Sequence, residues 1–448
     1  RNLSINPHLY MKQSKYNCIL QDNTGMVIYN AATDQLVALT PQLANIFNDG
    51  KAEPEKIKAQ HAELYDHLLQ KGIFVCDDAD ETETYIRKRE EYERSSGEYT
   101  ITINPTLACN MSCWYCYESH KNMPAMSADV KQSVLLLIDK LLADNKLKKL
   151  NLSFFGGEPL LYFDKVVVDI INHAKMQCKA FDAKLSIHFT TNAYLLTDNV
   201  LKQLEGLDVS FQITIDGGKQ VHDSVRKTKG GEPTYARIVE HIHQTLSRGF
   251  SVGVRFNYTA KSIPSFIDVV KDFSHLQQEQ KQLVNFTFQR VWQDNEGDAS
   301  QVEQQVEHIE RAFEQAGLFV NNAKSYNVPY CYADGVNTAV VNYNGDLFKC
   351  TARDFATKSK EGTLAADGTL RWNERLRKRM SIRHGSDTCL QCRIYPICHG
   401  GCSQMKLEVP DGISSCPKGY DDDKIQEIME GRALYLLTSC KRQKSSNQ

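Results

Sequence analysis

Three cysteines stand close together in the run Cys109-Asn110-Met111-Ser112-Cys113-Trp114-Tyr115-Cys116. Thiolates at this spacing can hold three irons of a cubane [4Fe–4S] cluster and leave the fourth iron without a protein ligand. A structural zinc site needs four ligands, and this loop offers three, with His120 following at a poor spacing. The loop therefore favours an iron–sulfur cluster over a zinc knuckle, and the open iron of that cluster can bind another molecule.

Seven further cysteines lie between Cys331 and Cys416, in a chain of 448 residues with 14 cysteines in all. A chain this long does not need disulfides to make up for a small core, and residues 1–10 lack the apolar stretch of a secretory signal. Such clustering favours metal ligation over disulfides. Four scattered cysteines are assigned no role, because lone cysteines are usually small buried apolar residues: Cys18, Cys76, Cys178 and Cys440.

The run Gly156-Gly157-Glu158-Pro159 follows a predicted strand. Two glycines let the backbone approach a ligand closely, and a carboxylate beside them can accept hydrogen bonds from an ammonium group. Alone, Gly-Gly before Pro is more often a turn. Because this run comes one strand after the three-cysteine loop, it indicates a ligand site.

The elements that must position these residues alternate between strands and helices. Runs rich in β-branched or aromatic residues predict strands at 100–104, 150–155, 184–190, 209–215, 251–258 and 283–291. Apolar residues at helical spacing predict helices at 127–142, 163–176, 198–204, 235–246, 264–273 and 301–316. This alternation predicts an α/β fold, a partial (β/α)6 barrel whose parallel sheet is buried on both faces. Ligands gather at the carboxyl ends of such strands, where both motifs fall.

Over about residues 100–300, these motifs resemble the radical S-adenosylmethionine (SAM) enzymes. In that family the open iron binds SAM, and one electron cleaves SAM to methionine and a 5′-deoxyadenosyl radical that abstracts a substrate hydrogen. The resemblance implies that Cys109, Cys113 and Cys116 hold the cluster and that Tyr115 packs near the adenine.

The resemblance also implies a set of SAM contacts: Gly156, Gly157 and Glu158 at the methionine ammonium, Asn192 at the ribose, Thr214 where relatives carry a Ser-x-Asp-Gly segment, and Arg226 at the carboxylate. Arg226 follows His222-Asp223, which completes that signature, and guanidinium suits bidentate pairing with a carboxylate. A surface ion pair is the alternative for Arg226. Ala193 departs from the pattern, since relatives carry Gly after the Asn.

The later cysteines resemble the seven-cysteine SPASM domain of radical SAM peptide- and protein-modifying enzymes, over about residues 327–420. The resemblance implies two auxiliary [4Fe–4S] clusters, one on Cys389, Cys392, Cys398 and Cys416 and the other on Cys331, Cys350 and Cys402. Two four-ligand clusters need eight ligands, and the seven cysteines leave one auxiliary iron open. An open iron can bind and deprotonate a substrate thiol. Cys18, Cys440 or a non-cysteine ligand could equally close the site. Some relatives have an extra cysteine where this chain has Asn337. A pair of zinc sites is the alternative.

Three domains are expected, at 1–95, 96–320 and 321–448. The first is a winged-helix-like module, with strands near 16–20, 26–29 and 36–39 and helices near 41–47 and 61–71. It resembles leader-recognition domains, which bind a leader peptide as an added strand; an inert packing module is the alternative. The second is the radical SAM partial barrel. The third is a loop-rich iron–sulfur domain, ending in a helix, that metal sites would stabilise.

Composition excludes other classes of protein. The formal charge of −2 lacks the bulk electrostatics of a nucleic-acid binder. No run of 18 apolar residues occurs, so no membrane-spanning helix is expected. We therefore expect a cytoplasmic protein with no nucleic-acid or membrane partner.

Together these patterns predict a radical SAM/SPASM oxidoreductase that installs a thioether or carbon–carbon crosslink in a ribosomally made precursor peptide. It would use SAM, three [4Fe–4S] clusters and an external one-electron donor. The alternatives are an anaerobic sulfatase maturase, which forms formylglycine, and a non-catalytic metal-binding protein. Sulfatase maturases carry an Asp directly after the Cys of a Gly-x₄-Cys segment, whereas here Thr351 follows Cys350. Asp354 is expected to be a solvated turn residue, which counts against formylglycine formation.

Overall fold

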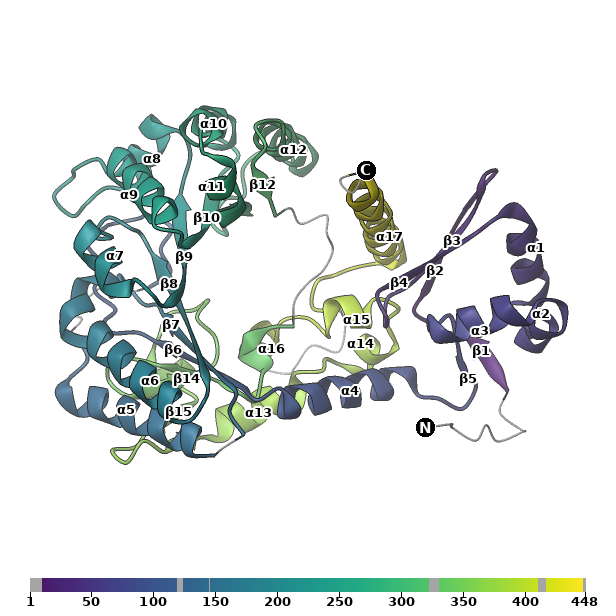
Figure 1. The fold of residues 1–448 in the computed structure, drawn as a ribbon, viewed down its shortest axis with the longest axis horizontal. Coiled ribbons are helices and arrows are strands. Elements are labelled where there is room, and N and C mark those ends of the chain that lie inside the picture. The colour runs from purple at the N-terminus through teal and green to yellow at the C-terminus, as the bar shows by residue number, and fades with distance from the viewer. Residues whose placement is uncertain (1–9, 119–123, 145, 322–329, 410–415, 446–448) are drawn as a thin grey trace. The chain divides into compact units, whose positions relative to one another are not determined.

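The computed structural model describes residues 10–118, 124–144, 146–321, 330–409 and 416–445 (Figure 1). The chain forms two compact units. The larger unit consists of residues 96–322 and 335–377, and the smaller unit of residues 1–95, 323–334 and 378–448.

The larger unit is built on a sheet whose central strands are parallel. Six strands follow one another in spatial order: β6 (Glu98–Ile103), β7 (Lys149–Phe154), β8 (Lys184–Thr191), β9 (Asp208–Ile215), β10 (Ser251–Tyr258) and β11 (Val284–Arg290). Each pairs in parallel with the next. The predicted α/β fold with a parallel sheet is confirmed, and the six predicted strands lie within two residues of their observed bounds.

Helices connect these strands and lie along one face of the sheet (Figure 1). They are α5 (Ala128–Ala143), α6 (Val168–Ala180), α7 (Asp198–Leu204), α8 (Lys219–Val225), α9 (Tyr235–Ser247), α10 (Phe266–Ser274), α11 (Gln278–Leu283) and α12 (Ala299–Gln315). Two of the long helices begin at capping side chains, as the sequence favours. The Ser127 hydroxyl accepts from the Val130 N–H at 3.3 Å, and the Asp298 carboxylate accepts from the Gln301 N–H at 3.0 Å.

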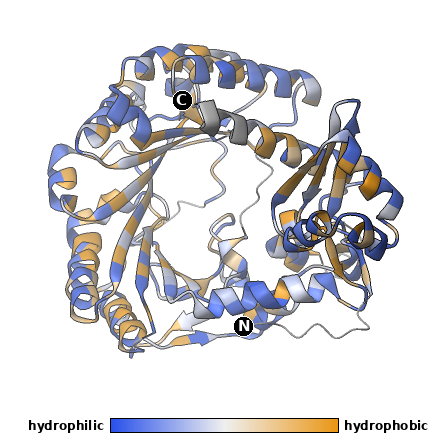
Figure 2. Cartoon of the chain, turned by 45° about the vertical axis from the view of Figure 1, so that its right-hand side comes forward, coloured by the Kyte–Doolittle hydropathy of each residue, from blue (hydrophilic) through white to orange (hydrophobic). Residues whose placement is uncertain are grey.

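The two faces of the sheet differ, and here the expectation that both are buried is wrong. On β10, Val252, Val254 and Phe256 are buried under the helices, whereas Gly253, Arg255 and Asn257 are half-buried on the other face. Apolar and polar residues alternate along the central strands, as the mixed colours of Figure 2 show. Strands covered on both faces are near-continuously apolar instead, so this sheet has one wet, polar face.

Short strands extend the sheet at both edges. β12 (Phe319–Val320) joins β11, while β13 (Thr338–Val341), β14 (Asp346–Phe348), β15 (Gly362–Leu364) and β16 (Leu370–Trp372) continue beyond β6. β13 pairs in parallel with β6, from Thr338 opposite Thr100 to Val341 opposite Ile103. Residues 335–377 therefore pack with the barrel strands and do not form part of a separate unit that begins at residue 321.

The smaller unit combines the N-terminal segment with residues from the other end of the chain. Its strands are β1 (Met11–Gln13) paired with β5 (Phe74–Cys76), and an antiparallel sheet of β2 (Asn17–Asp22), β3 (Gly25–Asn30) and β4 (Gln35–Leu39). Its helices are α1 (Pro41–Gly50), α2 (Pro54–Gln60), α3 (Ala62–Gln70), α4 (Glu81–Ser95), α14 (Asp387–Gln391), α15 (Tyr395–Cys398), α16 (Ser403–Glu408) and α17 (Asp422–Ser445), while α13 (Glu374–Ile382) spans the division between the units. The Leu390 carbonyl ties the two segments, since it accepts from Lys15 Nζ at 3.0 Å and Thr82 Oγ1 at 2.8 Å.

Among the described residues, no helix combines the length and the apolar composition that a membrane crossing requires.

Candidate functional site

The three-cysteine loop lies between β6 and α5 and is anchored at its centre. The Met111 side chain is buried in the core, and its backbone forms an antiparallel bridge with Thr228. The Ser112 N–H donates to the Lys227 carbonyl at 3.3 Å, and the Lys229 N–H donates to the Asn110 carbonyl at 3.0 Å. The cysteine loop is thus held beside the segment that follows Arg226.

The three thiols of this loop lie close enough to influence one another. Burial raises the pKa of Cys109 to about 12, with further contributions from the negative charges of Glu158 and Cys113. Burial also raises the pKa values of Cys113 and Cys116, and Cys116 adds to the shift at Cys113. Without a cation these thiols stay protonated, whereas a bound metal favours their thiolate forms.

The number of thiols bears on which metal group they fit. The loop supplies three cysteine ligands, whereas a structural zinc site uses four. Three ligands suit a cubane cluster with one open iron.

Glycines bring the turn after β7 against the cysteine loop. A Cβ atom on Gly157 would lie 2.2 Å from the Ala108 carbonyl oxygen and 2.4 Å from that of Leu107. Gly156 has a φ of 109° and equally little room, with the Thr106 carbonyl oxygen at 2.4 Å. The two glycines therefore allow the turn after β7 to pack closely against the start of the cysteine loop.

Glu158 is fully buried beneath this turn. Its carboxylate accepts from the Leu160 N–H at 3.0 Å, the Thr191 hydroxyl at 2.7 Å and the Asn192 N–H at 2.8 Å. Burial raises its pKa, and these three hydrogen bonds act in the opposite direction. A carboxylate has about four lone-pair sites, and three of those of Glu158 are used. These hydrogen bonds tie the β7 turn to the end of β8.

A buried network surrounds Tyr115. Its hydroxyl donates to Asp216 Oδ2 at 2.7 Å and accepts from Arg226 Nη1 at 2.7 Å and Asn257 Nδ2 at 3.2 Å. Arg226 is only 8% exposed, so the alternative of a surface ion pair is wrong. Burial raises the pKa of Asp216 to about 6, although the Arg226 charge acts against the shift.

Several buried polar atoms in this network lack a hydrogen-bond partner among the described residues. In the network they are Arg226 Nε and Asp216 Oδ1, and Asn110 Nδ2 in the cysteine loop is another such atom. An unpartnered buried polar atom costs about 1–3 kcal/mol, and more when it is charged. The cluster of such atoms beside the cysteine loop fits a site built for a polar, charged ligand.

Asn192 lies at the end of β8, beside the cysteine loop. Its side-chain amide donates to Asn110 Oδ1 at 2.8 Å, and its Oδ1 accepts from the Tyr194 N–H at 3.0 Å. Ala193 has a φ of 60°, in the left-handed region that favours the Gly of relatives. Thr214 is half-buried on β9, on the polar face of the sheet and opposite Arg255.

His222 and Asp223 act on the backbone around Arg226. His222 Nδ1 accepts from the Asp216 N–H at 3.3 Å, so its Nε2 carries the proton toward Thr234 Oγ1 at 3.1 Å. Asp223 Oδ1 accepts from the N–H groups of Thr234 and Tyr235, each at 2.8 Å. The His-Asp pair of the signature thus positions the segment that carries Arg226.

A pocket of about 230 Å³ adjoins Tyr115 and Asp216. Apolar side chains supply part of its wall: Trp114, Val221, Val225 and Val291. An apolar pocket next to a charged network suits a ligand with a flat, weakly polar part and a charged part.

The smaller unit holds a second group of cysteines. Cys389, Cys392, Cys398 and Cys416 line one cavity of about 270 Å³. All four are free thiols, and the charges of the other three contribute to raising the pKa of Cys398, after burial. Three consecutive residues in the left-handed region, His399, Gly400 and Gly401, turn the chain after Cys398. Four thiols around one cavity can hold a metal group, either an iron–sulfur cluster or zinc.

The remaining cysteines are distributed differently. Cys331 and Cys402 belong to the smaller unit and Cys350 to the larger one. Cys18 and Cys178 are buried in apolar cores, and Cys76 is half-buried on β5. The side chain of Cys440 and all of His120 lie outside the described residues.

The comparisons with known proteins identify the kind of domain that this part of the chain forms. The radical SAM superfamily model matches residues 103–260. An uncharacterised protein of Methanocaldococcus jannaschii is 25% identical over 56% of this chain and 84% of its own length. The radical SAM cyclopropyl synthase TigE of Paramaledivibacter caminithermalis is 24% identical, over 40% of each chain.

Two solved structures share the fold at 16% identity. The anSMEcpe structure with bound AdoMet and the Kp18Cys peptide has a TM-score of 0.59 and covers 76% of this chain and 99% of that chain. Streptococcus suis SuiB bound to S-adenosylmethionine has a TM-score of 0.51, over 93% of this chain and 100% of that chain. This chain therefore contains a radical SAM domain, a member of a superfamily that binds SAM and a [4Fe–4S] cluster.

The sequence missed several residues that build the site. Asn110 and Asn257 carry no motif of their own, and the signature around Thr214 does not predict that Asp216 is the partner of Tyr115. The one available signal was position, since Asn257 lies at the carboxyl end of β10 on the polar face. Asp354 is half-buried, and its charge contributes to raising the pKa of Cys116, so it is not the freely solvated residue that was expected.

Proposed function

We propose that this protein is a radical SAM peptide maturase that installs a thioether or carbon–carbon crosslink in a ribosomally made precursor peptide. One observation carries the proposal. At the carboxyl ends of β6 to β10, the fold gathers the thiols of Cys109, Cys113 and Cys116, a glycine turn and a buried Arg226–Asp216 pair whose hydrogen bonding is incomplete among the described residues.

The residues at this site fit SAM and a cluster. When bound, these groups supply a 5′-deoxyadenosyl radical, which removes a hydrogen atom from an unreactive C–H bond. In the proposal, Cys109, Cys113 and Cys116 hold the cluster. The other contacts follow the motifs: Gly156, Gly157 and Glu158 at the methionine ammonium, Asn192 at the ribose, Arg226 at the carboxylate and Tyr115 near the adenine, with Thr214 as a further SAM contact.

The unpartnered atoms support this assignment. Arg226 Nε is a buried donor without an acceptor, and a SAM carboxylate would supply one. The apolar wall formed by Val221, Val225 and Val291 beside Tyr115 would receive the adenine. Glu158 would act mainly through position, because its carboxylate already fixes the turn that presents Gly156 and Gly157.

The cysteines outside the radical SAM domain are assigned to two auxiliary [4Fe–4S] clusters of a SPASM domain. The cavity lined by Cys389, Cys392, Cys398 and Cys416 supports the first. Cys331, Cys350 and Cys402 would hold the second. A crosslink removes two hydrogen atoms from the peptide, one as an atom and the other as a proton and an electron. The proposal therefore needs an internal electron acceptor, besides an external one-electron donor that starts each cycle.

A peptide substrate is supported by two observations. The fold is shared with anSMEcpe, whose structure contains a peptide, and with SuiB over 93% of this chain, which includes the N-terminal segment. In the antiparallel sheet of the smaller unit, β2 and β4 pair with β3 and with no other described strand. Such edges can take an added strand, which is the mode proposed here for a leader peptide.

Anaerobic co-expression with the short open reading frames beside this gene tests the proposal. Mass spectrometry of each peptide should show the loss of two hydrogens, with fragmentation blocked between the joined residues. A peptide that instead reacts with a hydrazide would carry an aldehyde, as formylglycine does. Unmodified peptides throughout would refute both.

A further inference from the structure

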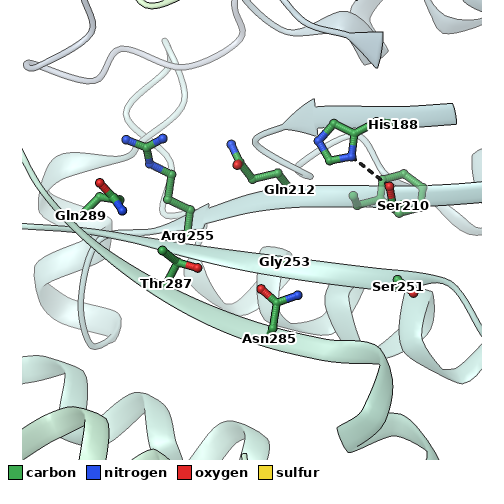
Figure 3. Close-up of a pocket in the computed structure, with 10 residues that line it drawn as sticks. His188, Ser210, Gln212, Ser251, Gly253, Arg255, Asn285, Thr287 and Gln289 are labelled. Atoms are coloured by element: carbon green, nitrogen blue, oxygen red, sulfur yellow. Dashed lines mark hydrogen bonds between the residues drawn. The ribbon is translucent and has the colours of Figure 1, made fainter. Parts of the chain in front are cut away.

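A second pocket, of about 350 Å³, opens on the polar face of the sheet and is not used by the proposed cofactor contacts. Its walls come from four neighbouring strands, β8 to β11, and Figure 3 shows the side chains projecting from them. Amides and hydroxyls make up most of the lining. Arg255 is its one charged side chain, apart from the ionisable His188, and no carboxylate lines it among the described residues.

Strand register explains why this pocket is open. Gly253 lies opposite Gln212 of β9 and Asn285 of β11, and Arg255 lies opposite Thr214 and Thr287. Because alternate residues of a strand share a face, these side chains all point into the same space. Gly253 contributes no side chain to its row, which leaves a hollow directly beside Arg255.

The guanidinium of Arg255 is only partly used within the protein. Its Nε donates to Asn257 Oδ1 at 2.9 Å, and neither terminal nitrogen has a hydrogen bond or ion pair with a described residue. Burial lowers the pKa of Arg255, against the raising effect of the nearby charges of Tyr117, Tyr115 and Asp216. A half-buried cation that keeps its two terminal nitrogens for an open pocket is arranged to bind an anion.

We propose that this pocket binds a carboxylate of the peptide substrate, with Arg255 as its bidentate partner and Gln212, Asn285 and Thr287 as neutral hydrogen-bonding neighbours. This inference rests on the proposed function, because it takes the bound molecule to be a peptide. One guanidinium among neutral groups matches a single negative charge, whereas a phosphate would need further cations.

The position of the pocket explains how a bound carboxylate would orient the peptide. Asn257 lies two residues beyond Arg255 on β10, and it joins Arg255 Nε to the Tyr115 hydroxyl inside the three-cysteine loop. A residue anchored at Arg255 would therefore hold its neighbours in the peptide near the radical site. Arg255 is thus a specificity-determining residue, which selects an acidic residue close to the one that is modified.

A binding experiment tests this directly. Immobilised, anaerobically reconstituted protein with SAM is incubated with randomised, N-acetylated pentapeptides, in one arm amidated and in the other with a free C-terminus. Bound peptides are sequenced by mass spectrometry. Wild type should enrich Asp and Glu over Asn and Gln by about tenfold, the effect of one charge-assisted contact. Enrichment of Asp and Glu in the amidated arm identifies a side-chain carboxylate. Retention of the free-arm peptides over the amidated ones, without a preference for Asp or Glu, identifies the terminal carboxylate and overturns the selection of an acidic residue.

Variants separate this inference from the proposed function. Arg255→Met should lose the preference and Arg255→Glu should reverse it toward Lys, while Lys271→Glu, with the same charge change on exposed α10, should keep it. SAM cleavage in the absence of peptide should persist in all three variants. Equal Asp and Glu enrichment in wild type and Arg255→Met, or no binding at all, overturns the inference. Loss of SAM cleavage in both Arg255 variants also overturns it, because Arg255 would then serve the cofactor. No SAM cleavage by wild type refutes the proposed function instead.

Discussion

At the scale of single residues, Arg226 shows most clearly that this site is built around a ligand. It is a buried cation with one short hydrogen bond to Tyr115, a 3.9 Å approach to Asp216 and an unpartnered Nε. A fold gains little stability from such an arrangement, because desolvation of the charge offsets most of the attraction. An anionic ligand group would complete it.

Arg226→Lys should weaken SAM binding by about tenfold or more, because lysine cannot supply the planar pair of donors that a carboxylate uses. Equilibrium binding of labelled SAM to the anaerobically reconstituted protein measures the change. Arg248→Lys is the matched control, since Arg248 forms ion pairs with Asp198 and Glu205 on the surface. Equal affinity of Arg226→Lys and wild type would contradict the role assigned to Arg226.

His222 gives a prediction about pH. Burial lowers its pKa to about 3, and its Nδ1 already accepts from the Asp216 N–H, so the folded state holds it neutral. The unfolded state takes up a proton near pH 6.5, so the stability that His222 contributes is present above that pH and is lost as pH falls toward 3. The free energy of unfolding should drop by about 1.4 kcal/mol per pH unit in this window because of His222 alone.

Chemical denaturation at pH 7.5, 6.5 and 5.5 measures this dependence. His222→Asn should flatten the slope between the two lower values, whatever its effect on absolute stability. His308→Asn, a change on the exposed face of α12, should leave the slope as in wild type. A slope that His222→Asn does not alter would show that this histidine is not held neutral in the folded state.

At the scale of elements, the site depends on loops that fix one another. The turn after β7 contacts the cysteine loop so closely that Gly157 has no room for a side chain. The Glu158 N–H donates to the Ala108 carbonyl at 2.8 Å across the same interface. The cysteine loop therefore owes its position to β7 and to the segment after Arg226, as well as to β6.

Gly157→Ala should displace the cysteine loop, because its Cβ would meet the backbone oxygens of Leu107 and Ala108, which cannot rotate away. We expect the loss of most of the iron bound by this loop and a destabilisation of about 1–3 kcal/mol. Iron analysis and thermal unfolding measure both. Gly230→Ala is the control, since its nearest neighbour is the Thr228 hydroxyl oxygen at 3.6 Å. Wild-type iron content in Gly157→Ala would contradict this account of the loops.

Sequence periodicity predicted the central elements well but not the edges of the sheet. The six central strands and the longer helices beside them are 6 to 17 residues long, which is enough for a strand or helix period to show in the sequence. β13 to β16 have three or four residues each, too few to show a period, and only their pairing beyond β6 makes them strands. The polar face of the sheet was not predicted for another reason. Alternation along β8 to β10 fits general β-propensity as well as it fits two different environments.

Motif spacing predicted the thiols but not the residues that surround them. The four cysteines that line one cavity are the four that the resemblance to the SPASM domain assigns to one cluster. The network of Tyr115, Asp216, Arg226 and Asn257 joins four separate segments of the chain. No pattern along a single segment contains such a network, so it becomes visible only in three dimensions.

At the scale of the whole molecule, the radical SAM site and the four-cysteine cavity belong to different compact units. The double variant Cys389→Ser with Cys416→Ser should therefore lower the iron content by about four per chain and keep SAM cleavage without peptide. Crosslinking of the peptide should be lost, because the electron acceptor is lost. Cys76→Ser, on β5, should change none of these quantities. Loss of SAM cleavage in the double variant would contradict independent sites.

The most direct measurement of the central claim is the release of 5′-deoxyadenosine from SAM by anaerobically reconstituted protein, read together with bound iron. We predict dithionite-dependent release by wild type with about twelve irons per chain. Changing Cys109, Cys113 and Cys116 together to Ala should abolish release and remove about four irons. Zinc in place of iron, or release that persists in the triple variant, would contradict the account.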